Sequence, residues 1–166
     1  MRLRARPQLH YAPVPGGVYL SGARAQFAMR GPEALFTVVD VCVPLLEEGA
    51  TEDDLVTALG SERARPVVRQ LTAGLRGHGM LLDLDTLTEP EPAPEVRSRY
   101  PEALAHLESV SDDPYARFAA LRTASVLLAG PPQLVLPALR GLHRAGVGRL
   151  LVATDAAEQV AATVER

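Results

Sequence analysis

The stretch 17-GVYLSGARAQFAMRGPEAL-35 decides the fold of the first part of the chain. Val18 and Leu20 share one face of a first short strand, and a Ser-Gly pair then breaks the chain. In the next strand, apolar Phe27 and Met29 alternate with polar or small neighbours, which is typical of a half-buried strand. A Gly-Pro pair ends this alternation, and proline is favoured in the first turn of a helix. The stretch therefore predicts two short strands that lead into a helix.

The flanking sequence extends this pattern to three strands followed by three helices. The segment LHYAPV (9–14) predicts a strand before the quoted stretch, and MLLDL (80–84) predicts a last extended segment. Helices are expected at 32–48, from Thr51, and from Ser61 to Gly77. We expect Pro44 to kink the first helix or end it early, and Thr51 and Asp54 to form a near capping box.

The second half of the chain predicts a linker followed by a segment that mixes helices and strands. An acidic, proline-rich segment, DLDTLTEPEPAPE (83–95), predicts a linker. Two helices are expected at 100–109 and 114–122, followed by strand SVLLAG (125–130), a helix and strand VGRLLVATD (147–155). A further helix is expected at 156–166. The predicted class is α+β: a winged-helix-like domain of a three-stranded antiparallel sheet and three helices at 1–84, a linker at 85–98, and a partial Rossmann-like βαβ segment at 99–166.

Composition excludes several classes of protein. The 166 residues include one cysteine, Cys42, so neither a disulfide framework nor a cysteine-based zinc site can form within one chain. All 17 basic residues are arginine, which excludes a P-loop lysine or a Schiff-base lysine. No apolar run approaches the roughly 18 residues of a membrane helix, and no signal peptide is evident. We therefore expect a cytoplasmic protein that does not contact membranes.

No catalytic constellation stands out. Between the two strands of the βαβ segment, a nucleotide site requires glycines, whereas this turn reads Ala129-Gly130-Pro131-Pro132 and two prolines lack N–H donors. The four histidines, at positions 10, 78, 106 and 143, do not have metal-ligand spacing. We expect a non-catalytic protein without a metal or a cofactor.

Charge is arranged in blocks. Residues 1–30 carry five arginines and no acid, residues 31–62 carry eight acids and no base, and residues 63–76 carry four arginines. One explanation is nucleic-acid binding by a winged helix, but the hairpin here precedes all three helices instead of following the recognition helix. Another is capture of an acidic peptide, added as a fourth strand to the sheet beside the third helix. A solvated basic face remains a third explanation.

The sequence resembles a known family at this point. The order of elements in GVYLSGARAQFAMRGPEALF, TEDDLVTAL and RPVVRQLTAGLRGHGMLLD resembles the PqqD-like precursor-peptide recognition element of ribosomally synthesised, post-translationally modified peptide (RiPP) pathways. The segment at 114–155 resembles the opening of a ThiF-like, ubiquitin-activating-type domain, although its glycine loop is degraded and it lacks zinc-ligand cysteine pairs. The two parts occur together in partner proteins of azoline-forming cyclodehydratases, including those of thiopeptide pathways.

The resemblance implies that the chain binds the leader region of a precursor peptide and delivers it to a cyclodehydratase or another modifying enzyme. The peptide would lie between the third strand and the third helix. Nucleic acid is not an expected partner, and the open strand edge could also pair with a second copy of the chain. The implied peptide-binding residues are Arg24, Ala25, Gln26, Phe27, Ala28, Met29, Arg30, Arg65, Val68, Arg69 and Thr72.

Overall fold

The computed structural model describes residues 1–153. The predicted helix at 156–166 lies outside the described residues. The chain divides into two compact units: residues 1–87 together with 108–112 form the first, and residues 88–107 together with 113 onward form the second. The last three residues of the helix at 101–110 and the two residues after it are thus part of the first unit.

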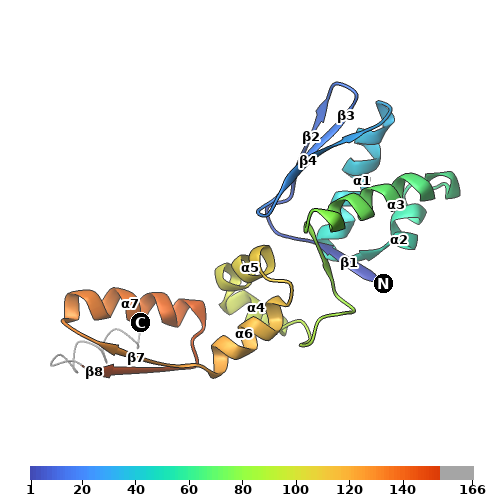
Figure 1. Cartoon of the computed structure of the whole chain (residues 1–166). Coiled ribbons are helices and arrows are strands. Elements are labelled where there is room, and N and C mark those ends of the chain that lie inside the picture. The colour runs from blue at the N-terminus through green and yellow to red at the C-terminus, as the bar shows by residue number, and fades with distance from the viewer. Residues whose placement is uncertain (154–166) are drawn as a thin grey trace. The chain divides into compact units, whose positions relative to one another are not determined.

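The first unit contains the elements expected from the sequence and one further sheet (Figure 1). Its elements are β1 (Arg2–Ala5), β2 (His10–Val14), β3 (Gly17–Ser21), β4 (Gln26–Arg30), α1 (Ala34–Glu48), β5 (Ala50–Thr51), α2 (Glu52–Ala58), a 3-10 turn (Glu62–Ala64), α3 (Arg65–Gly77) and β6 (Leu81–Asp83). Strands β2, β3 and β4 form an antiparallel sheet in that order, as the sequence predicts.

The further sheet has the order β5-β1-β6, and the local sequence pattern does not predict β1. Leu3 is fully buried in this strand, and it pairs with Ala50 on one side and with Asp83 on the other. Each partner lies far away along the chain, so the four residues RLRA carry no local signal of this pairing. The sheet brings the start of the chain beside the α1–α2 connection and beside the segment that follows α3.

The core of the first unit lies between the sheets and the three helices. Fully buried leucines come from its strands and helices: Leu3, Leu20, Leu46, Leu55, Leu71 and Leu75. Pro44 does not end α1, which runs unbroken to Glu48, so the expectation of an early end is wrong. The ring of Pro44 is exposed while Val43 and Leu46 beside it are buried, and this packing holds the helix together despite the missing hydrogen bond.

Helix α2 begins at a complete capping box, as the sequence predicts. The hydroxyl oxygen of Thr51 accepts from the Asp54 N–H (3.2 Å), and the Asp54 carboxylate accepts from the Thr51 N–H (2.8 Å). The Asp54 carboxylate also accepts from the Thr51 hydroxyl (2.7 Å). The bonds that this carboxylate accepts, first from the Thr51 hydroxyl and then from the Thr51 N–H, lower the pKa of Asp54 below its ordinary value of 3.8. The box sets where α2 begins and therefore where its acidic first turn is placed.

The second unit consists of three helices and a small α/β layer. Its elements are α4 (Pro94–Arg99), α5 (Pro101–Val110), α6 (Pro114–Thr123), β7 (Ser125–Ala129), α7 (Pro132–Ala145) and β8 (Arg149–Ala153). Strands β7 and β8 pair in parallel through the α7 crossover, so the βαβ segment forms as expected. Helix α4 forms within the segment predicted as a linker. Among the described residues, no helix is long and apolar enough to cross a bilayer.

Candidate functional site

Strand β4 has one open edge, and the hydrogen bonds at the two ends of the β3–β4 pair show which backbone groups face it. The Gly22 N–H donates to the Ala25 carbonyl oxygen (2.9 Å), and the Gly31 N–H donates to the Gly16 carbonyl oxygen (3.1 Å). Hydrogen-bonded and non-hydrogen-bonded pairs alternate in an antiparallel ladder. Phe27 and Met29 therefore bond to β3, whereas the backbone groups of three residues point away from it: Gln26, Ala28 and Arg30.

The opposite edge of this sheet is poorer in donors. The same alternation makes Ala12 bond to β3, so that the backbone groups of Tyr11 and Pro13 in β2 face outward. Pro13 has no N–H to donate, and proline on an edge strand is a common protection against strand addition. Of the two outer edges of this sheet, β4 offers the more complete row of donors and acceptors.

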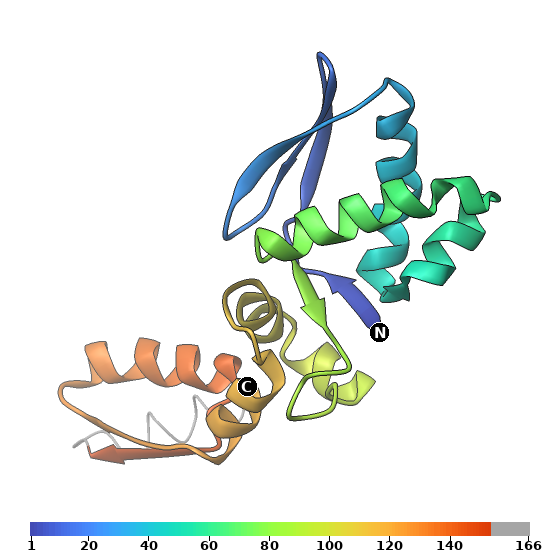
Figure 2. The ribbon, with the colours of Figure 1, turned by 45° about the vertical axis from the view of Figure 1, so that its right-hand side comes forward.

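Phe27 brings β4 against helix α3. Its ring stacks on the imidazole of His78, with centroids 4.1 Å apart and planes 7° from parallel. Gly74 lies one turn before His78 on α3, and a side chain there would meet the Phe27 ring at 3.3 Å. The absence of a side chain at Gly74 therefore allows the close approach of β4 and α3. Figure 2 shows α3 passing beside the sheet at this point.

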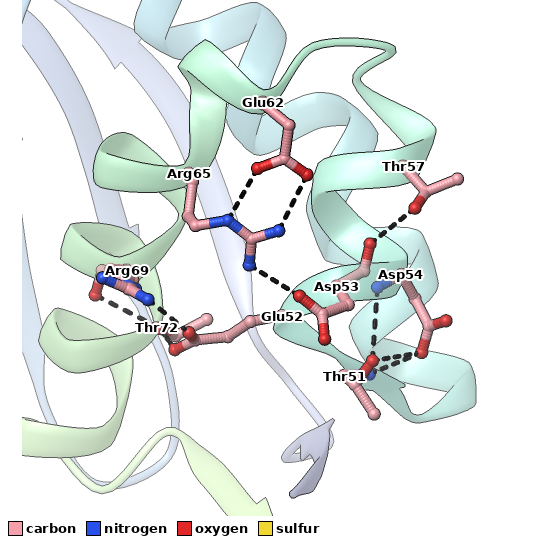
Figure 3. A network of polar contacts seen from close by, with 9 residues as sticks. All are labelled: Thr51, Glu52, Asp53, Asp54, Thr57, Glu62, Arg65, Arg69 and Thr72. Atoms are coloured by element: carbon pink, nitrogen blue, oxygen red, sulfur yellow. Dashed lines mark hydrogen bonds and ion pairs between the residues drawn. The ribbon is translucent and has the colours of Figure 1, made fainter.

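The predicted arginine of α3 nearest its start, Arg65, does not lie free beside β4. Its guanidinium donates to both carboxylate oxygens of Glu62 (2.8 and 2.9 Å) and to Asp53 in α2 (2.6 Å). Hydrogen bonds with these carboxylates raise the pKa of Arg65 above its ordinary value. Figure 3 shows the guanidinium held between the two acids, so its charge is compensated inside the unit.

Arg69 and Thr72 also face α2. The Thr72 hydroxyl donates to the Glu52 carboxylate (2.8 Å), and the Arg69 guanidinium lies 3.8 Å from the same carboxylate (Figure 3). Val68 is fully buried. Positions spaced by three or four residues share one face of a helix, so the four α3 residues implied by the resemblance share the α2 side. The polar partners of Arg65, Arg69 and Thr72 include acids of α2 and of the 3-10 turn.

Sequence reasoning missed Gly74 of α3 and His78, the C-cap residue of this helix, which lie against Phe27. Their four-residue spacing places them on one face of α3, and a glycine inside a helix is unfavourable unless packing requires it. An unfavourable glycine inside α3 was therefore the feature of the sequence that could have indicated this close contact. The blocks of charge drew attention to the arginines instead, and those residues serve the α2–α3 contact.

Arg24 and Arg30 carry positive charge near the two ends of β4. Arg24 lies in the β3–β4 turn, where its guanidinium donates to Asp112 (2.5 Å) and to the Ser109 carbonyl oxygen (3.2 Å). Arg30 is exposed at the other end of the strand. Along the strand itself, Ala25 is half-buried, Met29 is buried and the Gln26 side chain accepts a hydrogen bond from the Tyr19 hydroxyl. The β4 residues implied by the resemblance thus lie along one edge.

The α2–α3 contact makes the stability of the protein pH-dependent. Glu62 accepts hydrogen bonds from Arg65, and these bonds lower the pKa of the Glu62 carboxyl below its ordinary value of 4.5. A carboxylate whose pKa is lower in the folded state than in the unfolded state stabilises the fold at pH values above its unfolded-state pKa. This contribution is lost as the pH falls through the folded-state pKa. We expect urea unfolding of Glu62→Gln to lose less stability on acidification below 4.5 than the wild type does. Glu47→Gln, at an exposed position in α1, is the matched control and should behave like the wild type. Identical pH profiles for the wild type and Glu62→Gln would contradict this.

Two other chemically distinctive places in the described part of the chain are the Cys42 thiol and the start of α7. Burial raises the pKa of the Cys42 thiol to about 11, which keeps it protonated and inert near neutral pH. Helix α7 has Pro131 at its N-cap and Pro132 in its first turn, so two donors are missing where a nucleotide phosphate would bind. Within residues 1–153 there is no cluster of three or more His, Cys, Asp or Glu side chains that could hold a metal.

A pocket of about 560 Å³ lies where the β2–β3 turn meets the start of α1. Glu33 and Phe36 line it on the helix side, and Pro13 to Gly17 line it on the strand side. None of the peptide-binding residues implied by the resemblance lines this pocket.

Comparison with known proteins finds solved structures with a similar fold. No protein-family profile and no curated protein sequence matches the chain. The microcin C7 biosynthetic enzyme MccB, solved in complex with N-formylated MccA, matches with a TM-score of 0.62 and 12% identity over 92% of this chain. E. coli MccB solved with ATP matches with a TM-score of 0.60, also at 12% identity and over 92% of this chain.

A second solved protein shares the fold at a lower score. The heterocyclase TruD matches with a TM-score of 0.52 and 19% identity, again over 92% of this chain. The chain spans 41–43% of the length of the two MccB chains and 20% of TruD. The structure therefore has an α+β fold that is similar to part of the microcin C7 biosynthetic enzyme MccB and to part of the heterocyclase TruD.

Proposed function

We propose that this protein binds the leader region of a ribosomally synthesised precursor peptide by strand addition to β4, in a RiPP pathway. The open edge of β4 carries this proposal: Gln26, Ala28 and Arg30 present their backbone groups outward along one row. An extended peptide placed there completes a fourth strand, and backbone hydrogen bonds supply affinity for any sequence that can lie flat.

The fold neighbours support a peptide partner. MccB was solved with N-formylated MccA and TruD is a heterocyclase, so the fold is shared by proteins that bind or modify peptides. Both neighbours are much longer than this chain. Activity is therefore not carried over to it, and we propose a non-catalytic role in which the bound peptide is presented to a separate modifying enzyme such as a cyclodehydratase of a thiopeptide or azole-peptide pathway.

Side-chain recognition follows from the surroundings of β4. Alternate residues of an added strand point to opposite sides of the sheet. On the α3 side, the peptide meets the stacked rings of Phe27 and His78, which favour an apolar or aromatic residue. Positive charge is available at the two ends of the strand, from Arg24 and Arg30. The bound segment is therefore an apolar-anchored peptide with acidic residues toward its ends.

A domain of this kind would act by tethering the precursor peptide near the modifying enzyme. Holding the leader raises the effective concentration of the core peptide at the active site of a partner enzyme, by a factor set by the connecting chain. Sequence specificity then resides in the leader, and the modifying enzyme can tolerate variation in the core.

Fluorescence anisotropy with two labelled probes tests this function. One probe is an extended, end-blocked peptide of about eight residues that alternates Val and Thr and carries a glutamate at each end. The other is duplex DNA. We expect saturable binding of the peptide and weak, salt-sensitive binding of DNA, because Arg65 and Arg69 are already paired with α2 acids. Tight DNA binding without peptide binding would instead favour a nucleic-acid-binding regulator. Sedimentation without peptide shows whether β4 pairs with a second copy.

A further inference from the structure

Two arginines hold residues 108–112 against the rest of the first unit, to which these residues belong. Arg6, whose side chain is only 7% exposed, donates to the carbonyl oxygens of Glu108 (2.6 Å) and Ser111 (2.5 Å) and to the Asp112 carboxylate (3.1 Å). Its burial lowers the pKa of Arg6 to about 10. Arg24 donates to the same Asp112 oxygen and to the Ser109 carbonyl oxygen.

The two arginines depend on Asp112 to different degrees. Arg6 is buried and keeps two backbone carbonyl partners if the carboxylate is lost. Arg24 is 26% exposed, and Asp112 provides its one ion pair among the described residues. Asp112 itself is 87% exposed and is not required to fill space. Arg24 is therefore the partner that can exchange one carboxylate for another.

Arg24 lies where a peptide on β4 would end. It is two residues before Gln26, the first residue of β4 with outward-facing backbone groups. Its side chain runs toward the end of α3, since a side chain at Gly79 would come within 3.4 Å of its Cδ atom. A strand added along β4 as far as Gln26 would therefore end within two residues of Arg24.

We propose that Asp112 is an intramolecular competitor for Arg24, which gives up its contact with Asp112 when a peptide carboxylate binds at this end of β4. This inference rests on the proposed peptide-binding function and names a specificity-determining residue for the same site. The peptide class that the site selects is then one with an acidic residue at the terminal position of the added strand.

Competition of this kind sharpens specificity. When only a fraction of a protein is in the state that can bind, its apparent dissociation constant is the intrinsic one divided by that fraction, so binding is weaker. An acidic peptide supplies a new charge-assisted bond to Arg24 in place of the one it displaces. A neutral peptide gains nothing from displacing Asp112 and leaves the Arg24–Asp112 pair intact. Removing the Asp112 charge should therefore help acidic peptides and leave neutral ones unaffected.

The test compares Asp112→Asn with the wild type by anisotropy. The acidic probe is the Val/Thr peptide described above, and the neutral probe has a glutamine in place of each glutamate. We expect Asp112→Asn to bind the acidic probe about three- to tenfold more tightly, since a neutral amide is the weaker competitor. The affinity for the neutral probe stays the same. Glu102→Gln, at an exposed position of α5, removes an equal charge and serves as the matched control.

A second variant separates competition for Arg24 from a general charge effect. In Arg24→Ala, the acidic and neutral probes should bind with more similar affinities, and adding Asp112→Asn to it should change nothing. Equal gains for both probes in Asp112→Asn, or a gain that persists without Arg24, would overturn the inference. So would unchanged or weaker binding of the acidic probe.

The two proposals fail differently. If both probes bind the wild type and Asp112→Asn equally well, the peptide-binding function stands and the competitor role of Asp112 is refuted. If neither probe binds any variant while the circular dichroism spectra remain those of folded protein, the peptide-binding function fails and the role of Asp112 fails with it.

Discussion

Ala28→Pro is expected to weaken binding of the acidic Val/Thr peptide by at least about tenfold, which corresponds to 1.4 kcal/mol. The N–H of Ala28 faces away from β3, so proline at this position leaves the β3–β4 ladder intact. It removes the central donor of the open edge, and the ring occupies the space that the added strand needs. Proline is tolerated on edge strands. The protein should therefore remain folded while it loses the peptide.

Ala28→Ser is the control for this change. It keeps the N–H and adds a small polar side chain at an exposed position, so peptide affinity should stay close to that of the wild type. Anisotropy titrations give the affinities, and circular dichroism reports whether each variant is folded. A folded Ala28→Pro protein that binds the peptide as tightly as Ala28→Ser would show that the peptide does not add to β4.

The second large effect is expected for Gly17→Ala, in the neighbouring strand. A side chain at Gly17 would come within 2.0 Å of the Met29 carbonyl oxygen, a contact that only movement of the backbone can relieve. The β3–β4 pair must then open where Met29 is buried. Strain of this kind costs about 1–3 kcal/mol or more. We expect the free energy of unfolding to fall by that amount and peptide affinity to fall as well, because β4 loses its support.

Gly77→Ala is the matched substitution for this comparison. Gly77 is the last residue of α3, and a side chain there would meet no atom within 4 Å. Alanine is the better helix former, so stability should be unchanged or raised by less than about 1 kcal/mol. Denaturant unfolding followed by circular dichroism measures both variants. Equal stability of Gly17→Ala and Gly77→Ala would contradict the close approach of β3 and β4.

The parts of the fold that were predictable are those with a local pattern. Alternation around Phe27 and Met29 indicated β4, and the Thr51–Asp54 spacing indicated the start of α2. Strand β1 was missed because its partners, β5 and β6, lie far away in sequence. The uninterrupted course of α1 through Pro44 was missed for a related reason, since tertiary packing outweighs the local effect of a proline.

The candidate site shows the same division. The residues of β4 lie together because they are consecutive in one strand. The side of α3 that meets β4 depends on how the helix is rotated in the core, and blocks of charge do not reveal that rotation. Acids in the first turn of a helix are favoured by the helix dipole alone, so their presence at the start of α2 indicates no further partner. In the structure, Glu52 and Asp53 also hold the arginines of α3. Asp112 could not be linked to Arg24 from sequence, because 88 positions separate them.

Amide hydrogen exchange, followed by NMR with and without the acidic Val/Thr peptide, tests strand addition to β4 most directly. The amides of Phe27 and Met29 bond to β3, so they should be protected in both states. The amides of Gln26, Ala28 and Arg30 should exchange quickly in the free protein and slowly once the peptide is bound. Unchanged exchange at these three amides with saturating peptide, or new protection at Tyr11 on the opposite edge, would contradict the account.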